Sequence, residues 1–470
     1  MVALMKLRIK SILAGILFCC CQAVVTQASL SRQINAIVSS QKGVQFSIHI
    51  IEAGSGQTVY AYNARQPLMP ASNMKVVTTA AALKYLGADF KYTTRLGMCG
   101  ETLVVVGSGD PLFGDRKTDA KYDRKPDWIF EYIAAALKRS GIAKVTDIIV
   151  DTSVFDDQRV HPNWPKEELN RWYACEVCGL NFNGNCIEIT ADNKGGRVVL
   201  SVLQQTTYIE IISKLIPITS GTSTVGAYRE DRPNKITIKG KCKGTVGPFD
   251  VAVERPAGFF GYMLAEHLTK AGIEVKGQLS EKPRPVNCDF RLLAEFTTPI
   301  SDCLERANKD SLGLAAESLV KTIAASNNPG TKNGSWERGR ELISQYLLKI
   351  GVKSDQFYID DGSGLSRKNR LTAEAITKVL LEIYRSPYWE LFRNSLAVGG
   401  VDGTLSRYFK EQNYKYKILG KTGYVNTAKS FSGICITDKG DYLFSILANN
   451  TNGQTREAIN DIAKAIIDNL

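Results

Sequence analysis

The sequence PASNMK at residues 70–75 places a serine three positions before a lysine, at the start of a helical pattern. Its proline suits the first turn of a helix, apolar residues recur through 74–86, and Gly87 follows as a stop. Positions i and i+3 share one face of a helix, so the side chains of Ser72 and Lys75 can meet. A lysine whose charge is disfavoured by its surroundings can take the serine proton and so activate a nucleophile.

Ser-x-x-Lys is a weak signal by itself, because the chain contains two more copies, at 39–42 and 318–321. In the copy at 318–321, Glu317 and Lys321 have the spacing of an ordinary ion pair on a helix surface. Ser72 differs because it directly follows a predicted β-hairpin. The alternative interpretation is that Ser72 only caps its helix.

A second short motif, Lys421-Thr422-Gly423, occurs once and precedes a strand predicted at 430–437. A lysine and a hydroxyl on a strand can hold a carboxylate. The glycine leaves room for a ligand backbone to pair along the strand edge. Ser-x-x-Lys followed by Lys-Thr-Gly is a two-part signature of serine acyl-transfer enzymes.

Four longer stretches accompany these motifs: GSGDP at 107–111, DDGSGLS at 360–366, NRLT at 369–372 and GVDGTL at 400–405. With them, nearly the whole chain after residue 28 resembles the penicillin-binding D-alanyl-D-alanine carboxypeptidases/endopeptidases. These are the low-molecular-mass class C penicillin-binding proteins, of the penicillin-binding protein 4 type. Asp361 and Ser363 within these stretches are interpreted as loop-shaping residues, since the adjacent glycines indicate tight turns.

The resemblance implies a second motif, Ser-x-Asn, at Ser311-Leu312-Gly313. Ser311 matches, but Gly313 stands where asparagine is expected. In the family that asparagine donates to a substrate carbonyl and steadies the catalytic lysine. Loss of a positioned polar partner of this kind costs about 10²–10³-fold in rate. Residues 326–328, Ser-Asn-Asn, spell the same motif in a turn and are an alternative.

The resemblance also implies a mechanism. Ser72 would attack the carbonyl between two D-alanines, with Lys75 as general base. Ser311 together with Lys421 would pass the proton to the leaving amine. The backbone N–H groups of Ser72 and Tyr424 would hold the oxyanion. This chemistry requires no metal and no organic cofactor.

The substrate-binding residues implied by the resemblance are Thr422, Gly423, Tyr424 and Asp151. Lys421 and Thr422 would hold the terminal carboxylate, and relatives usually carry serine or threonine at the position of Tyr424. Asp151 matches the segment of the insert whose acidic residue reads the amine end of the peptide's diamino-acid side chain. The alternative is a turn-forming aspartate at a strand end.

The predicted fold class is α+β, a β-lactamase/transpeptidase-like helix–sheet–helix domain with an inserted β-rich region. The catalytic domain is expected to be discontinuous, formed by 29–92 and 290–470. Residues 93–289 would form the insert, as one or two small domains with one helix at 258–271. Further helices are predicted at 301–325, 336–350, 372–386 and 456–470, and β-hairpins at 44–62 and 430–448.

Residues 1–28 have the layout of a secretory signal peptide. Three basic residues precede an apolar run at 12–18, and small residues occupy 26–28. We therefore expect export to the periplasm. The alternatives are a retained anchor helix and a lipoprotein attached through one of the cysteines at 19–21. The formal net charge of +12 is scattered, which favours weak attraction to anionic surfaces, including peripheral membrane association, and not nucleic-acid binding.

Eight cysteines follow the signal peptide, an even number that permits disulfides in an exported chain. Cys175-x-x-Cys178 followed by Cys186 has zinc-like spacing, but no fourth ligand is evident nearby. A disulfide or plain burial is the alternative. Cys303 and Cys435 lie in apolar segments and are expected to be free and buried.

The implied function is a serine D,D-carboxypeptidase/endopeptidase that acts on peptidoglycan stem peptides and is acylated by β-lactam antibiotics. A β-lactamase, or another D-amino-peptide hydrolase, is an alternative on the same fold. Gly313 and Tyr424 motivate a second alternative, a cell-wall-binding pseudoenzyme. The three histidines, His49, His161 and His267, fall in a hairpin, the insert and a helix, which argues against a Ser–His–Asp triad.

Overall fold

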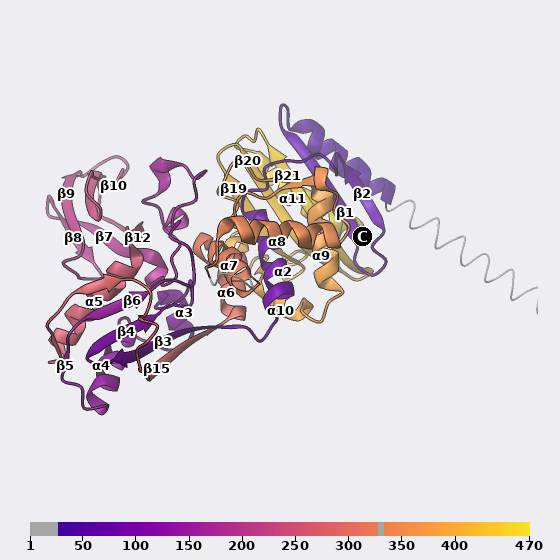
Figure 1. The fold of residues 1–470 in the computed structure, drawn as a ribbon. Helices are drawn as coiled ribbons and strands as arrows, with labels where there is room; N and C mark the ends of the chain where they lie inside the picture. The colour runs from indigo at the N-terminus through magenta and orange to yellow at the C-terminus, as the bar shows by residue number, and fades with distance from the viewer. Residues whose placement is uncertain (1–26, 328–332) are drawn as a thin grey trace, which may run out of the picture.

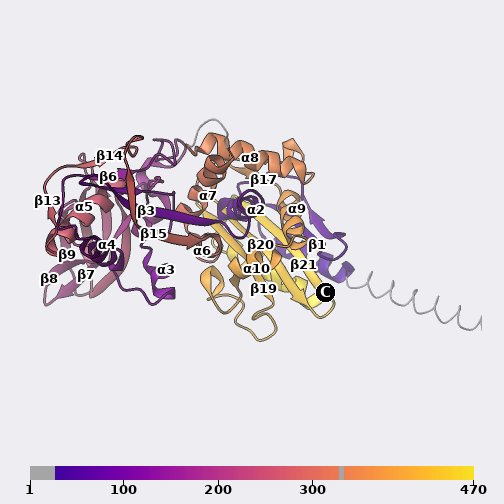
Figure 2. The ribbon, with the colours of Figure 1, turned by 60° about the horizontal axis from the view of Figure 1, so that its bottom comes forward.

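The computed structural model describes residues 27–327 and 333–470, so the predicted signal peptide falls outside them apart from its last two positions. The chain forms two lobes (Figures 1 and 2). Two antiparallel strands, β3 (Lys91–Cys99) and β15 (Phe290–Pro299), lead from one lobe to the other. Within the described residues, no helix combines the length and the apolar character that a membrane crossing needs.

The lobe predicted to be catalytic is built on a six-stranded sheet that includes strands from both ends of the chain. Its order is β18-β19-β20-β21-β1-β2, and β1 and β21 pair antiparallel from Gln45 opposite Asn449 to Glu52 opposite Tyr442. The strands are β1 (Gln45–Glu52), β2 (Thr58–Tyr62), β18 (Ala397–Val398), β19 (Ile418–Val425), β20 (Ala428–Thr437) and β21 (Gly440–Asn449).

Helices cover both faces of this sheet because its strands alternate apolar side chains between the faces. Leu443 and Leu447 belong to the core under one layer of helices, while Phe444 and Ile446 belong to the core on the opposite face. The first layer comprises α2 (Met74–Leu86), α6 (Ile300–Asn308), α7 (Gly313–Ser326), α8 (Trp336–Lys349), α9 (Ala373–Tyr384) and α10 (Trp389–Ser395). On the other face lie α11 (Thr455–Asn469) and a helix over 27–40.

The insert lobe contains three main sheets. A five-stranded sheet has the order β14-β6-β4-β3-β15, and two three-stranded sheets have the orders β12-β7-β8 and β10-β11-β9. The strands not yet given are β4 (Thr102–Val106), β5 (Lys144–Val145), β6 (Ile148–Asp151), β7 (Cys186–Lys194), β8 (Arg197–Val202), β9 (Glu210–Pro217), β10 (Gly226–Arg229), β11 (Lys235–Cys242), β12 (Thr245–Ala252), β13 (Glu274–Val275) and β14 (Leu279–Glu281).

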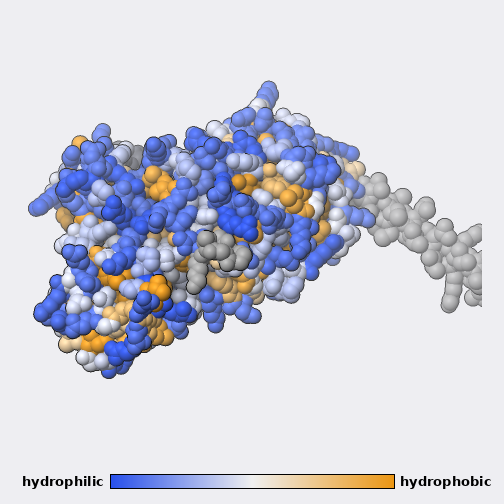
Figure 3. Space-filling model, in the orientation of Figure 1, coloured by the Kyte–Doolittle hydropathy of each residue, from blue (hydrophilic) through white to orange (hydrophobic). Residues whose placement is uncertain are grey.

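The helices of the insert are α3 (Arg116–Lys121), α4 (Trp128–Arg139) and α5 (Pro256–Lys270). Only the last was predicted. The pattern of α4 is helical, with Ile129, Phe130, Ile133 and Leu137 buried on one side, but strand-like segments surround it in the sequence. The face of the molecule shown in Figure 3 is mainly hydrophilic, with apolar patches on both lobes.

The predicted hairpins and the helices α2, α8, α9 and α11 are confirmed to within one or two residues at most boundaries. The single helix predicted at 301–325 is wrong, because the chain breaks between α6 and α7. Ser311 lies in this break with a φ of 63°, a left-handed conformation that no helix accommodates. The break separates Ser311 from the helix that it precedes and turns it toward the cleft described below.

A disulfide, Cys99–Cys288, joins the end of β3 to the segment before β15. Cys303 and Cys435 are free and buried, as predicted, and so are Cys175, Cys178 and Cys186. In the described part of the chain, no group of three histidine, cysteine, aspartate or glutamate side chains is arranged to hold a metal. The thiols of Cys175 and Cys178 are buried without a disulfide.

Candidate active site

Ser72 lies in a 3-10 turn, η1 (Ala71–Asn73), which leads directly into α2. The preceding Ala71 has a φ of 47°, a strained value for a residue with a side chain. Two hydrogen bonds tie the turn to the sheet: Ser430 Oγ donates to the Pro70 carbonyl at 2.6 Å, and Asn73 Nδ2 donates to the Lys421 carbonyl at 2.8 Å. The sheet thus holds the serine in a conformation that the turn alone would not favour.

Lys75 stands one turn along from Ser72, with only 2% of its surface exposed. Its Nζ lies 3.3 Å from Ser72 Oγ and donates to the Ser363 carbonyl at 2.8 Å. Burial lowers the pKa of Lys75 to about 8, although the nearby carboxylates of Glu317 and Asp361 act in the opposite direction. A lysine with this pKa is partly neutral near physiological pH and can accept the serine proton.

The loop that holds Lys75 is the Asp-Gly-Ser-Gly stretch at 361–364. Asp361 shapes it, since its carboxylate accepts from the backbone N–H groups of Gly364 at 2.8 Å and Ser366 at 2.6 Å. Gly364 has a φ of 83°, and a Cβ at this position would collide with the Ala71 carbonyl. The loop therefore packs against the serine turn in a way that requires glycine.

Lys421, Thr422 and Gly423 lie on β19, beside the serine turn. Lys421 is fully buried, and its Nζ donates to the Thr422 carbonyl at 2.7 Å. Burial, together with the charges of Lys75 and Arg456, holds the pKa of Lys421 well below its usual range. A Cβ on Gly423 would lie 3.0 Å from the Ser72 nitrogen, so a side chain here would cover the N–H group proposed as an oxyanion donor.

A cleft of about 520 Å³ opens over these residues. Six of the eight predicted site residues line it: Ser72, Lys75, Ser311, Thr422, Gly423 and Tyr424. Lys421 lies buried in the strand that forms its wall, and the side chain of Tyr424 at the rim is 69% exposed. The structure therefore brings the three motifs together from segments that are more than 100 residues apart in the sequence.

Residues 30–470 match the D-Ala-D-Ala carboxypeptidase 3 (S13) family. The chain belongs to this family. It is 28% identical over 465 residues to the D-alanyl-D-alanine carboxypeptidase of Actinomadura sp. (strain R39), covering 92% of this chain and 83% of that protein. It is 25% identical over 406 residues to the D-alanyl-D-alanine carboxypeptidase DacB of Haemophilus influenzae, covering 82% of this chain and 81% of that protein.

Among solved structures, the chain is similar to penicillin binding protein 4 (dacB) from Haemophilus influenzae, with a TM-score of 0.79 and 23% identity. The similarity covers 93% of this chain and 98% of that one. The predicted fold class and the resemblance stated from the sequence are confirmed. So is the enzyme class, a serine D-Ala-D-Ala carboxypeptidase of the S13 family.

Asp151, the eighth predicted site residue of this S13 chain, is not among the residues that line the cleft. It ends β6, and its carboxylate accepts from the backbone N–H groups of Ser153 at 2.9 Å and Arg284 at 2.8 Å. Its contacts match the alternative interpretation, an aspartate that organises the end of a strand.

The insert instead contributes Pro165, Glu168, Trp172 and Tyr173 to the cleft. Sequence reasoning missed all four. They lie in an irregular segment that contains two 3-10 turns, η2 (Lys166–Glu168) and η3 (Trp172–Ala174). No motif connects this segment to the distant catalytic stretches, so only the folded chain shows its place.

Gly313 is the first residue of α7 and also lines the cleft. A Cβ here would lie 2.8 Å from the backbone carbonyl oxygen of Tyr173. The insert backbone thus occupies the space next to the position where the S13 motif has asparagine. The alternative motif at 326–328 does not replace it, because Ser326 ends α7, far along the helix from the cleft, and Asn328 falls outside the described residues.

The interpretation of Glu317 and Lys321 as a surface ion pair is wrong, because neither side chain is exposed. Lys321 Nζ donates to Asp156 Oδ1 and to the Gln158 carbonyl, both at 2.6 Å. Glu317 accepts from backbone N–H groups of the loop at 361–364. The insert and α8 cover this face of α7, a tertiary arrangement that the local i,i+4 spacing does not reveal.

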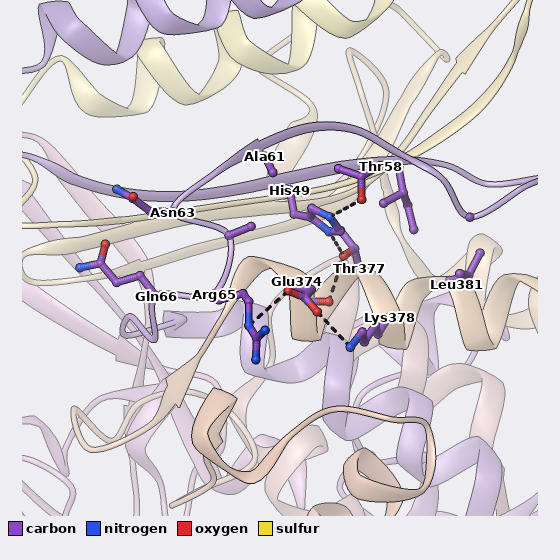
Figure 4. A pocket seen from close by; sticks show the side chains of 13 residues that line it. His49, Thr58, Ala61, Asn63, Arg65, Gln66, Glu374, Thr377, Lys378 and Leu381 are labelled. Carbon is purple, nitrogen blue, oxygen red and sulfur yellow. Dashed lines mark hydrogen bonds and ion pairs between the residues drawn. The ribbon is translucent and has the colours of Figure 1, made fainter.

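The histidines of this S13 chain all lie away from the cleft. His49 lines a second cavity, of about 710 Å³, between the β1–β2 hairpin and α9 (Figure 4). Its ring nitrogens bond the hydroxyls of Thr377 at 2.5 Å and Thr58 at 3.1 Å. His161 is buried beside Asp360, and His267 lies on α5. The predicted absence of a histidine from the proton transfer therefore agrees with where the three rings lie.

Proposed function

We propose that this S13 enzyme is a serine D-Ala-D-Ala carboxypeptidase/endopeptidase that cuts peptidoglycan stem peptides through an acyl-enzyme on Ser72. The observation that carries this proposal is the pairing of Ser72 Oγ with Lys75 Nζ at 3.3 Å, beside the Lys-Thr-Gly strand. Lys75 is buried, and its pKa is lowered to about 8, which suits it to the role of general base.

In the acylation step, neutral Lys75 accepts the Ser72 proton while Oγ bonds to the carbonyl carbon of the penultimate D-alanine. The N–H groups of Ser72 and Tyr424 stabilise the oxyanion. The C–N bond to the terminal residue then breaks, and the leaving amine receives the proton from Lys75 by way of Ser311 and Lys421. Water afterwards attacks the ester, which releases the shortened peptide and restores Ser72.

Substrate would lie along the side of β19 that faces the cleft, which Thr422, Gly423 and Tyr424 line. Lys421 and Thr422 would hold the terminal carboxylate. Tyr424 would limit which substrate groups fit at the open rim of the cleft. Asp151 has its carboxylate committed to backbone N–H groups, so we leave it out of this binding scheme. The lack of the motif asparagine at Gly313 would lower the rate without removing the nucleophile or its base.

Related proteins support acylation by β-lactams. The H. influenzae penicillin binding protein 4 structure is also known complexed with a β-lactam, at a TM-score of 0.73 to this chain. A relative in Dictyostelium discoideum, 24% identical over 476 residues, is named penicillin-sensitive carboxypeptidase A. We propose the same sensitivity here, and a periplasmic location in keeping with the signal peptide predicted at 1–28 and the peptidoglycan substrate.

The test is intact-protein mass after incubation with benzylpenicillin, with Ser72→Ala alongside. A lasting adduct on the wild type, absent from the variant, supports the proposal. Release of D-alanine from a pentapeptide, and of monomers from a cross-linked muropeptide, then separates carboxypeptidase from endopeptidase action. Fast drug turnover without peptide cleavage would favour the β-lactamase alternative. Muropeptide binding with neither adduct nor product would favour the pseudoenzyme.

A further inference from the structure

Glu317 lies behind the cleft, on the second turn of α7, with none of its surface exposed. Its carboxylate accepts three hydrogen bonds. The donors are the backbone N–H of Ser363 at 2.6 Å, the backbone N–H of Gly362 at 3.0 Å and Trp336 Nε1 at 2.8 Å. A buried carboxylate with three donors is held rigidly, and so are the groups that donate to it.

On its opposite side, the same two-residue segment, 362–363, accepts hydrogen bonds from α2. Lys75 Nζ donates to the Ser363 carbonyl at 2.8 Å, and Thr78 Oγ1 donates to the Gly362 carbonyl at 2.8 Å. Glu317 therefore fixes the N–H groups of residues 362–363, while α2 binds their carbonyl oxygens. The position of the oxygen that holds Lys75 depends on the carboxylate behind it.

We propose that Glu317 is a positioning residue that fixes Lys75 against Ser72 and governs the protonation of Lys75. This inference rests on the role of Lys75 in the proposed function. It gives a physical reason why the chain can lack the motif asparagine, which in the family steadies the same lysine. In this chain Gly313 offers no side chain, and the support for Lys75 comes from one turn further along α7, by way of the Ser363 carbonyl.

The charges around the pair agree with this assignment. The ionisable groups that face Lys75 are Glu317 on α7, Asp361 in the loop and Lys421 on β19. Burial lowers the pKa of Lys75, and the two carboxylates raise it. The charge of Glu317 thus opposes the effect of burial, so its removal should make Lys75 lose its proton at lower pH.

Glu317 itself is surrounded by few charges. The ionisable groups that interact with it are Asp361, Lys75 and Lys321, together with the Cys175 thiol. Burial raises the pKa of Glu317 to about 7, and the hydrogen bonds from Ser363, Trp336 and Gly362 oppose that rise. These three hydrogen bonds favour the ionised carboxylate, which is the form whose charge acts on Lys75.

The experiment is an NMR titration of Lys75 in protein with lysines labelled with ¹³C at Cε, using Lys75→Arg to assign the signal. In Glu317→Gln, the midpoint for Lys75 should fall by about one pH unit or more. The acylation rate with a chromogenic cephalosporin should fall about 10–100-fold at its high-pH plateau, because the loop carbonyl shifts. Glu317→Asp keeps the charge but not the reach, so the plateau rate should fall while the midpoint stays close to that of the wild type.

Asp360→Asn is the matched control. Asp360 is a buried carboxylate directly before this loop, 1% exposed, whose partners are Ser366, Asn163, Arg340 and His161, not the segment 362–363. It should leave the Lys75 midpoint unchanged. An unchanged midpoint in folded Glu317→Gln would overturn the inference. If the wild type forms no acyl-enzyme at all, the proposed function fails, while the NMR titration still decides whether Glu317 controls Lys75.

Discussion

The carbonyl oxygen of Tyr173 lies 2.8 Å from the point where residue 313 would carry a Cβ atom. The two residues belong to different lobes, so the insert backbone closes on the catalytic lobe at a position that only glycine leaves open. Substitution of Tyr173 cannot remove its backbone carbonyl. The contact therefore restricts the side chain at residue 313 more strictly than a neighbouring side chain would.

Restoring the family asparagine should harm this protein. We expect Gly313→Ala to cost about 1–3 kcal/mol, because η3 or α7 must move to admit the methyl group. Gly313→Asn should be destabilised at least as much and should not acylate faster than the wild type. Thermal unfolding and the rate of benzylpenicillin acylation measure both effects. Gly453→Ala is the control, since a Cβ there has no neighbour within 4 Å. Faster acylation by a stable Gly313→Asn would contradict this account.

The rate of Ser72 acylation should rise with pH and reach half of its maximum near pH 8. Only neutral Lys75 accepts the serine proton, and burial places the pKa of Lys75 at about 8. Protonation at lower pH removes the base, so the rate falls on the acid side. Timed mass measurements of the acyl-enzyme across this range give the profile, with circular dichroism to confirm that the fold persists. A profile flat through pH 8 would exclude Lys75 as the base.

Asn73 joins the first motif to the third through its hydrogen bond to the Lys421 carbonyl. Asn73→Ala leaves that buried acceptor short of a partner, which costs about 1–3 kcal/mol, and frees the serine turn from β19. We expect slower acylation as well as lower stability. Asn193→Ala is the control, because Asn193 also donates to backbone carbonyls, those of Ile218 and Cys242, but in a part of the insert that does not line the cleft. It should lower stability while the acylation rate stays at the wild-type value.

Lys321 and Asp156 should respond unequally to neutral substitutions. The Lys321 side chain is fully buried, while that of Asp156 is 31% exposed. Asp156→Asn leaves a buried ammonium without its counter-ion, which we expect to cost about 3 kcal/mol. Lys321→Met leaves the Asp156 carboxylate, which water can still reach. The methionine side chain can pack against Trp336, so the loss of stability should be smaller. Equal losses of stability in thermal unfolding would show that the charges of Lys321 and Asp156 do not determine the strength of this contact.

Much of the site follows from the sequence because its chemistry sits in short, local patterns. Ser72 and Lys75 share a helix, and Lys421 to Gly423 share a strand, so their relation requires only regular geometry. The break at Ser311 does not follow in the same way, because a left-handed residue between two helical patterns leaves no periodic signal.

The sequence does not predict the contacts between distant segments. The spacing of Glu317 and Lys321 indicates a surface pair on a helix, and only the covering insert makes them buried groups with separate partners. The same holds for Tyr173, whose approach to Gly313 depends on how two lobes meet. The pairing of Cys99 with Cys288 was likewise one of many that eight cysteines allow.

The insert leaves and re-enters the catalytic lobe at neighbouring points, since Lys91 at the start of β3 pairs with Pro299 at the end of β15. A short linker could close that gap, so the insert looks excisable by connectivity. The contacts between the two lobes oppose its removal. Excision would strand the Lys321 ammonium without Asp156 and would remove Trp164, whose indole nitrogen donates to Asp361 at 2.9 Å in the loop beside Lys75. The two lobes have thus become mutually dependent, and transplanting this catalytic lobe without its insert would require redesign of the surface that the insert covers.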